Sequence, residues 1–148
     1  MRSIAIRLGI IAAIVVAFLV FRPFLSGNAS SLQVGDCFDV PTGTQTIEDV
    51  QHHPCTEPHG GEVVLVGNFE PSTSTFPTDA EFQDFVADTC LPAFDVYTGR
   101  SYETASELGI EWFTPTEESW KDGSRKVICY AVSADQATPN LSKSIKKT

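Results

Sequence analysis

A run of potential metal ligands and acid–base groups is concentrated in one short stretch, HHPCTEPHGGEVV, which spans residues 52–64. Imidazole, thiolate and carboxylate groups are the donors of zinc sites, and a catalytic zinc needs three of them on one side of the ion. The stretch holds all three histidines of the chain, one cysteine and two glutamates: His52, His53, His59, Cys55, Glu57 and Glu62. A metal or catalytic centre is therefore the first hypothesis to weigh.

The spacing of these residues argues against such a centre. There is no H-E-x-x-H motif, and the proline and two glycines around His59 disfavour the helix that would bring His59 and Glu62 to one face. In a strand that starts at Glu62, residues three apart point to opposite faces, and the adjacent His52 and His53 also diverge. We predict no metal ligand and no cofactor. His59 and Glu62 stay as a possible site, with a hydrogen bond that fixes the turn as their simplest role.

Nucleophilic catalysis has no recognisable motif either. There is no G-x-S-x-G turn, and a serine–histidine–acid set could be drawn only by arbitrary choice among many serines and acids. Trp112, Phe113 and Trp120 could form an aromatic binding platform, although in a small domain such residues more often belong to the core. We predict no catalytic residue and keep Trp120 as a possible binding residue.

The four cysteines, Cys37, Cys55, Cys90 and Cys129, include no C-x-x-C pair of the kind found in zinc ribbons and redox centres. All of them follow the hydrophobic N-terminal segment, so two structural disulfides are the economical interpretation. Four cysteines allow three connectivities. We favour Cys37–Cys55 and Cys90–Cys129 because each pair joins neighbours along the chain.

The first 25 residues are predicted to be a membrane anchor. Arg2 and Arg7 lie in or before an apolar run, and a helix over residues 4–25 would measure about 33 Å, enough to cross a hydrocarbon core of about 30 Å. The alternative is a cleaved signal peptide, since small residues follow the run. In both cases the positive residues hold the amino end in the cytoplasm and place the rest of the chain outside.

The rest of the 148-residue chain has room for one domain. We predict a polar spacer over 26–31, a domain over 32–134 and a disordered tail over 135–148, where lysines predominate. After the anchor there are seven Lys or Arg against nineteen Asp or Glu. Such an acidic surface repels phosphate backbones, so nucleic acid is excluded as a partner.

Elements of both types are predicted within the domain. The β-branched run over 62–69 indicates a buried strand, and 124–133 a final strand whose Cys129 faces inward. Thr78 and Glu81 form a capping box at the start of the main helix, over 78–94. A short helix would begin with Thr114 as cap and Pro115 in its first position. The fold class is α+β: a small antiparallel sheet, one main helix, one short helix and two disulfides, preceded by an N-terminal transmembrane helix.

The chain resembles the septum-formation domain family of actinobacteria in the order of its motifs. These are G-D-C-F, then a cysteine followed by P-H and E-V, then a lone cysteine, and then W-x-x-G before a final cysteine. The resemblance covers about residues 32–133. In this chain the pattern falls on Gly35, Asp36, Cys37, Phe38, Cys55, His59, Glu62, Cys90, Trp120, Gly123 and Cys129. It implies an exported or membrane-anchored protein with two disulfides and a link to cell division, and it assigns no catalytic residue. His52 and His53 do not belong to the pattern.

We therefore expect a non-enzymatic, membrane-anchored extracytoplasmic domain that binds a protein or cell-wall partner and is associated with septum formation. The expected location is the cell membrane, crossed once through residues 4–25, with the N-terminus in the cytoplasm. The alternative is a small extracytoplasmic hydrolase or metal-binding protein that uses His59 and Glu62.

Overall fold

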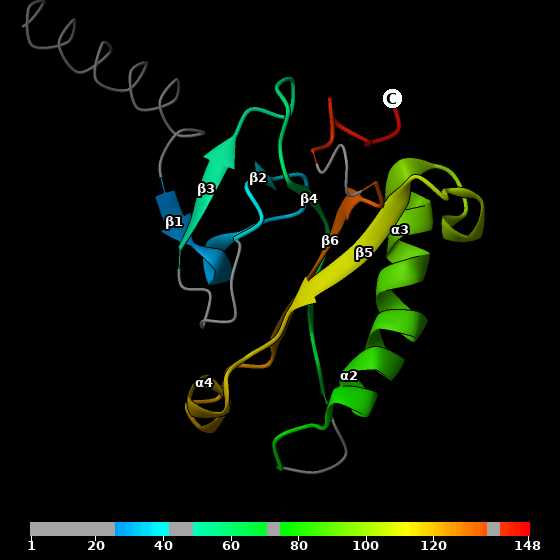
Figure 1. Ribbon diagram of the computed structural model, residues 1–148. Helices are drawn as coiled ribbons and strands as arrows, with labels where there is room; N and C mark the ends of the chain where they lie inside the picture. The colour runs from blue at the N-terminus through cyan, green and yellow to red at the C-terminus, as the bar shows by residue number, and fades with distance from the viewer. Residues whose placement is uncertain (1–25, 42–48, 71–74, 136–139) are drawn as a thin grey trace, which may run out of the picture.

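The computed structural model of the protein describes residues 26–41, 49–70, 75–135 and 140–148 (Figure 1). Its centre is a six-stranded antiparallel sheet with the strand order β1-β3-β2-β4-β6-β5. The strands are β1 (Ser26–Asn28), β2 (Cys37–Phe38), β3 (Asp49–His53), β4 (Gly61–Asn68), β5 (Leu108–Phe113) and β6 (Lys126–Ser133). The helical elements are η2 (Ala29–Ser31), α2 (Asp79–Phe85), the π-helical turn η3 (Val86–Cys90), α3 (Leu91–Thr98), η4 (Tyr102–Thr104) and α4 (Glu117–Lys121). The α+β class and the antiparallel sheet are as predicted.

The central strands β4 and β6 are covered on both faces because side chains alternate across a strand. On the face toward the helix, Val127, Cys129 and Ala131 of β6 join one core cluster. On the opposite face, Ile128 and Tyr130 join a second cluster, built with residues of η2, β2 and β3. The inward orientation predicted for Cys129 of the final strand is thus confirmed.

The main helical segment runs from α2 through the π-helical turn to α3 and packs beside β4, as Figure 1 shows. The capping box is confirmed: the Thr78 hydroxyl accepts from the Glu81 amide, and the Glu81 carboxylate accepts from the Thr78 amide. Pro92 has no N–H, so it cannot donate to the regular hydrogen-bond ladder, and the π-helical turn ends two residues before it, at Cys90. The segment ends at Gly99, whose φ of 74° favours glycine.

The short helix α4 begins two residues later than predicted. Its cap is Thr116, whose side chain accepts from the Ser119 amide, and not Thr114. Because β5 continues to Phe113, the chain at Thr114 is still leaving the strand and cannot yet turn into a helix. Trp120 of this helix is buried.

Trp120 belongs to the core and not to an exposed aromatic platform. Its ring packs against Phe69 and Phe76, and the guanidinium of Arg125 lies 3.6 Å from the ring centroid. This aromatic and cation–π packing fixes α4 against the end of the sheet.

Both predicted disulfides are present. Cys37–Cys55 joins β2 to the loop before β4, and Cys90–Cys129 joins the main helical segment to β6. Within the described residues there is no free cysteine.

The N-terminal part of the described chain differs from the predicted spacer. Over residues 26–31, β1 pairs with β3 and η2 contributes the buried Ala29 to the core, followed at once by the buried Leu32. The polar composition of this segment did not predict these contacts, because β1 pairs through its backbone and only one side chain of η2 is buried. The predicted membrane anchor, residues 1–25, lies outside the described residues. In the described ranges no helix is long and apolar enough to cross a membrane.

The C-terminal strap, which we define as residues 140–148, differs from the predicted disordered tail. It lies against the domain (red in Figure 1), with Leu141 buried and Ile145 packed on the core. Backbone hydrogen bonds join Leu141 to His59, Ser144 to Cys55 and Lys147 to Tyr97. The lysines of the strap face solvent. The strap is therefore ordered by its backbone and its two apolar side chains, in spite of its basic composition.

Candidate functional site

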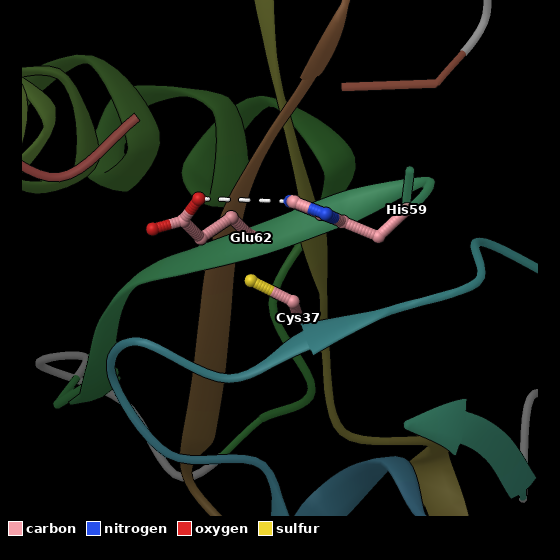
Figure 2. Close-up of side chains that lie close together, drawn as sticks. All are labelled: Cys37, His59 and Glu62. Carbon is pink, nitrogen blue, oxygen red and sulfur yellow. Dashed lines mark ion pairs between the residues drawn. The ribbon is translucent and has the colours of Figure 1, made fainter. Parts of the chain in front are cut away.

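The side chains of His59 and Glu62 are fully buried, with 0% exposure each. No other charged or imidazole side chain in the described part of the chain is buried. Figure 2 shows the two side chains turned toward each other above Cys37, with 3.6 Å between His59 Nε2 and Glu62 Oε2. Burying a charge without compensation costs several kcal/mol, so this pair must be held by specific contacts.

The convergence of His59 and Glu62 corrects the expectation that they point to opposite faces. Glu62 lies in β4, opposite Cys37 of β2 and Ala131 of β6, whereas His59 precedes the strand and pairs with Leu141 of the strap. Strand alternation therefore does not apply to His59. The turn between them requires Gly60, where a Cβ atom would lie 2.6 Å from the backbone nitrogen of Val40.

The Glu62 carboxylate accepts three hydrogen bonds from residues distant in the chain. Tyr97 Oη donates to Oε1 at 2.5 Å, Ser144 Oγ donates to Oε1 at 2.7 Å, and the Ile145 amide donates to Oε2 at 2.9 Å. Hydrogen bonds to an ionised acceptor are about twice as strong as neutral ones. The helix and the strap thus compensate the burial of the carboxylate together.

The His59 ring is held at one nitrogen only. Its Nδ1 donates to the Glu57 carbonyl at 2.7 Å, because a carbonyl oxygen can only accept. Its Nε2 has no hydrogen-bond partner, since 3.6 Å to Glu62 exceeds hydrogen-bond range. The contact with Glu62 is therefore an ion pair across a short gap.

The pKa values of the pair move apart. Burial acts to raise the pKa of Glu62, but the contacts from His59, Tyr97, Ser144 and Ile145 outweigh it and hold that pKa below its ordinary 4.5. Burial acts to lower the pKa of His59, but Glu62 and the Glu57 carbonyl outweigh it and raise that pKa above 6.5. Burial and then the Glu62 carboxylate raise the pKa of Tyr97 well above its usual range, so its hydroxyl remains a donor.

Stability should follow these two pKa values. A lowered carboxyl pKa contributes stability that is lost as pH falls through it, and a raised imidazole pKa contributes stability that is lost as pH rises through it. The contribution of the pair is complete between pH 4.5 and 6.5, the two ordinary values. We expect the urea midpoint to be highest in that window and to decline on both sides. In a His59→Gln variant, stability should fall less as pH rises above that window, because the imidazole whose deprotonation causes part of the loss is absent. An unchanged fall in the urea midpoint at alkaline pH would contradict the assignment.

The strap closes the site from outside. The His59 amide donates to the Leu141 carbonyl at 3.0 Å and the Leu141 amide to the His59 carbonyl at 2.8 Å. The Ser144 amide donates to the Cys55 carbonyl at 2.8 Å, which places the Ser144 hydroxyl over Glu62. Two side chains that complete the site, Tyr97 and Ser144, were not found from the sequence. The only signal for the strap was a pair of apolar residues, Leu141 and Ile145, among its lysines.

Removal of the Ser144 hydroxyl should weaken this closure. A Ser144→Ala substitution takes one of two donors from Glu62 Oε1, and a hydrogen bond to a charged group contributes about 1.5–3 kcal/mol. We expect a loss of that size in the free energy of unfolding, measured by urea denaturation. Ser142→Ala is the matched control because Ser142 is exposed on the same strap. Equal effects of the two substitutions would show that the Ser144–Glu62 bond contributes nothing.

The other two histidines do not join the site. His53 pairs through Nε2 with Asp39 Oδ2 at 3.0 Å near the surface, and His52 lies beside Gly27. In the described chain, the group of possible metal donors that comes together is Cys37, His59 and Glu62, with the donor atoms within 4.8 Å of one another. Cys37 is engaged in its disulfide there, so its sulfur is no thiolate ligand in this state.

The fold and this site define a class: a small α+β domain with two disulfides and, at its centre, a buried ion pair whose carboxylate accepts hydrogen bonds from the helix and the strap. Residues 26–129 match the sequence model of a family described as septum formation. The chain belongs to the septum formation family. The matched region contains the four cysteines, His59 and Glu62 and ends before the strap. No curated protein and no solved structure gave a significant match.

Proposed function

We propose that the protein is a non-enzymatic, membrane-anchored extracytoplasmic domain that binds a protein or cell-envelope partner during septum formation. The observation that carries the proposal is membership of the septum formation family over residues 26–129. In the proposed topology the chain crosses the membrane once through residues 4–25 and keeps its N-terminus in the cytoplasm. Two arginines at its amino end, Arg2 and Arg7, against one at its other end, Arg22, support that orientation.

The disulfides support the extracytoplasmic part of the proposal. Both cysteine pairs are oxidised, one of them in the centre of the core, and structural disulfides persist in oxidising compartments outside the cytoplasm. The acidic surface favours a partner that is not itself strongly acidic.

The state of Glu62 supports a binding role over hydrolysis. A general acid or base must come within hydrogen-bond reach of a substrate. Both Glu62 oxygens already accept hydrogen bonds from the protein, and neither Glu62 nor His59 has exposed surface. The alternative of a small hydrolase built on this pair therefore has no observation in its favour.

Imaging of dividing cells tests the septal role. A fluorescent protein that matures outside the cytoplasm is joined through a flexible linker after Thr148 of the full chain. We expect the signal to concentrate at the septum. A matched fusion of residues 1–31 alone, which lacks most of the domain, should spread evenly around the membrane. An even signal from the full chain, with normal division after deletion of the gene, would contradict the septal role.

Topology is tested separately. Protease added outside spheroplasts should digest the C-terminal fusion without lysis, and the fusion should sediment with membranes. Mass spectrometry of the mature amino terminus distinguishes an intact anchor from a cleaved signal peptide. A protected fusion in intact spheroplasts would overturn the proposed orientation.

A further inference from the structure

One buried nitrogen has no partner in an otherwise fully compensated site. His59 Nε2 is aimed at Glu62 and lies in one group with Glu62 and the Cys37 sulfur, their donor atoms within 4.8 Å of one another (Figure 2). We propose that opening of the Cys37–Cys55 disulfide creates a Zn²⁺ site whose protein ligands are Cys37 Sγ, His59 Nε2 and a carboxylate oxygen of Glu62. This inference is independent of the proposed septal role.

The distance between His59 Nε2 and Glu62 Oε2 is closer to that between two ligands of one metal ion than to a hydrogen bond. At 3.6 Å, Nε2 and Oε2 are too far apart for a hydrogen bond. Two zinc ligands with bonds of about 2.0–2.1 Å at a tetrahedral angle lie about 3.3 Å apart. His59 and Glu62 therefore stand close to ligand spacing before any rearrangement. The mixture of sulfur, nitrogen and oxygen donors is one that zinc accepts.

The contacts behind the ligands also match a metal site. Histidine ligands usually donate their second ring N–H to a carbonyl or carboxylate, which fixes the tautomer and the ring orientation. His59 Nδ1 makes such a bond to the Glu57 carbonyl, which directs Nε2 toward Glu62 and Cys37. The Glu62 carboxylate is oriented by Tyr97 and by the strap.

The two disulfides differ in how a reductant can reach them. Cys90 and Cys129 are both 0% exposed, whereas Cys55 is partly exposed in the loop before β4. Thiolate attack requires access to a sulfur atom. Cys37–Cys55 is thus the bridge that a dithiol can open first.

Opening of the Cys37–Cys55 disulfide is a two-electron reduction by a dithiol. A dithiol gives up two electrons and two protons and leaves as a disulfide, while the Cys37–Cys55 bond is reduced to two thiols. Zn²⁺ binding then releases the protons of the Cys37 thiol and of His59 Nε2 to solvent. Cys55 is not required as a ligand, since its sulfur lies 3.4 Å from the Gly35 carbonyl and outside the donor group.

Substitution of one cysteine tests the site without a reductant. The full chain with Cys55→Ser carries a free Cys37 thiol, and Cys37→Ser is the matched control with a free Cys55. We expect the Cys55→Ser protein to bind one equivalent of Co²⁺ with tetrahedral d–d bands and thiolate-to-cobalt charge-transfer absorption, both bleached by Zn²⁺. The Cys37→Ser protein should show neither. Adding His59→Gln to Cys55→Ser should weaken binding by more than the roughly 10- to 100-fold that loss of an outer hydrogen-bond partner costs.

A second measurement uses the wild-type chain and so does not depend on the folding of a variant. Limited reduction by a dithiol, followed by alkylation and mass spectrometry, should label Cys37 and Cys55 before Cys90 and Cys129. The partly reduced protein should give the same Co²⁺ spectrum, and the oxidised protein should not. The inference is overturned if the partly reduced wild type binds no Co²⁺ through thiolate, or if Cys90–Cys129 opens first.

Discussion

A Glu62→Ala substitution is expected to lower the free energy of unfolding by about 3–5 kcal/mol, the cost of removing one partner from a buried ion pair. The loss is large because the Tyr97 hydroxyl, the Ser144 hydroxyl and the Ile145 amide lose their acceptor together and His59 loses its counter-charge. A domain of this size has about 5–15 kcal/mol in total. Urea denaturation measures the change.

Two controls define the origin of this loss. Glu62→Gln keeps an acceptor oxygen for Tyr97 and Ser144, so it should retain part of the stability that alanine loses. Glu107→Gln removes a carboxylate that pairs with Arg100 on the surface, where both side chains are substantially exposed, and should leave the midpoint unchanged. If Glu62→Ala were no worse than Glu107→Gln, the buried pair would have no structural role.

Removal of the Cys90–Cys129 bridge should cost more than removal of Cys37–Cys55. On the chain-entropy model, sequence separations of 39 and 18 residues correspond to about 4 and about 3 kcal/mol respectively. Paired Cys→Ala variants of each bridge, compared by urea denaturation in oxidising buffer, measure the two losses. The entropic ordering is contradicted if the variant that lacks Cys37–Cys55 is the less stable one.

Local patterns in the sequence were sufficient for the parts of the fold that local contacts determine. The capping box of Thr78 and Glu81 depends on residues three apart, and the alternation in β6 depends on neighbours two apart. The cysteine pairing followed from proximity along the chain. By contrast, β3 ends in two histidines and β5 contains a glycine and a glutamate, so neither has the clean alternation that signals a strand.

The candidate site was only half predictable for the same reason. His59 and Glu62 were identified by type and spacing, but their orientation depends on Gly60 and on the pairing of His59 with the strap. The donors to Glu62 lie 35, 82 and 83 residues further along the chain. No periodicity or motif connects residues at such separations, because only the tertiary fold brings them together.

The distance along the chain between Glu62 and the strap also sets an order of events during biosynthesis. Glu62 enters the growing polypeptide long before Ser144 and Ile145, which supply two of its three donors. A chain that emerges from the amino end therefore carries a carboxylate without its full set of partners until residues 144 and 145 have left the ribosome and, on the proposed export route, the translocation channel. The domain can reach its final stability only after the strap has emerged and folded back onto β4.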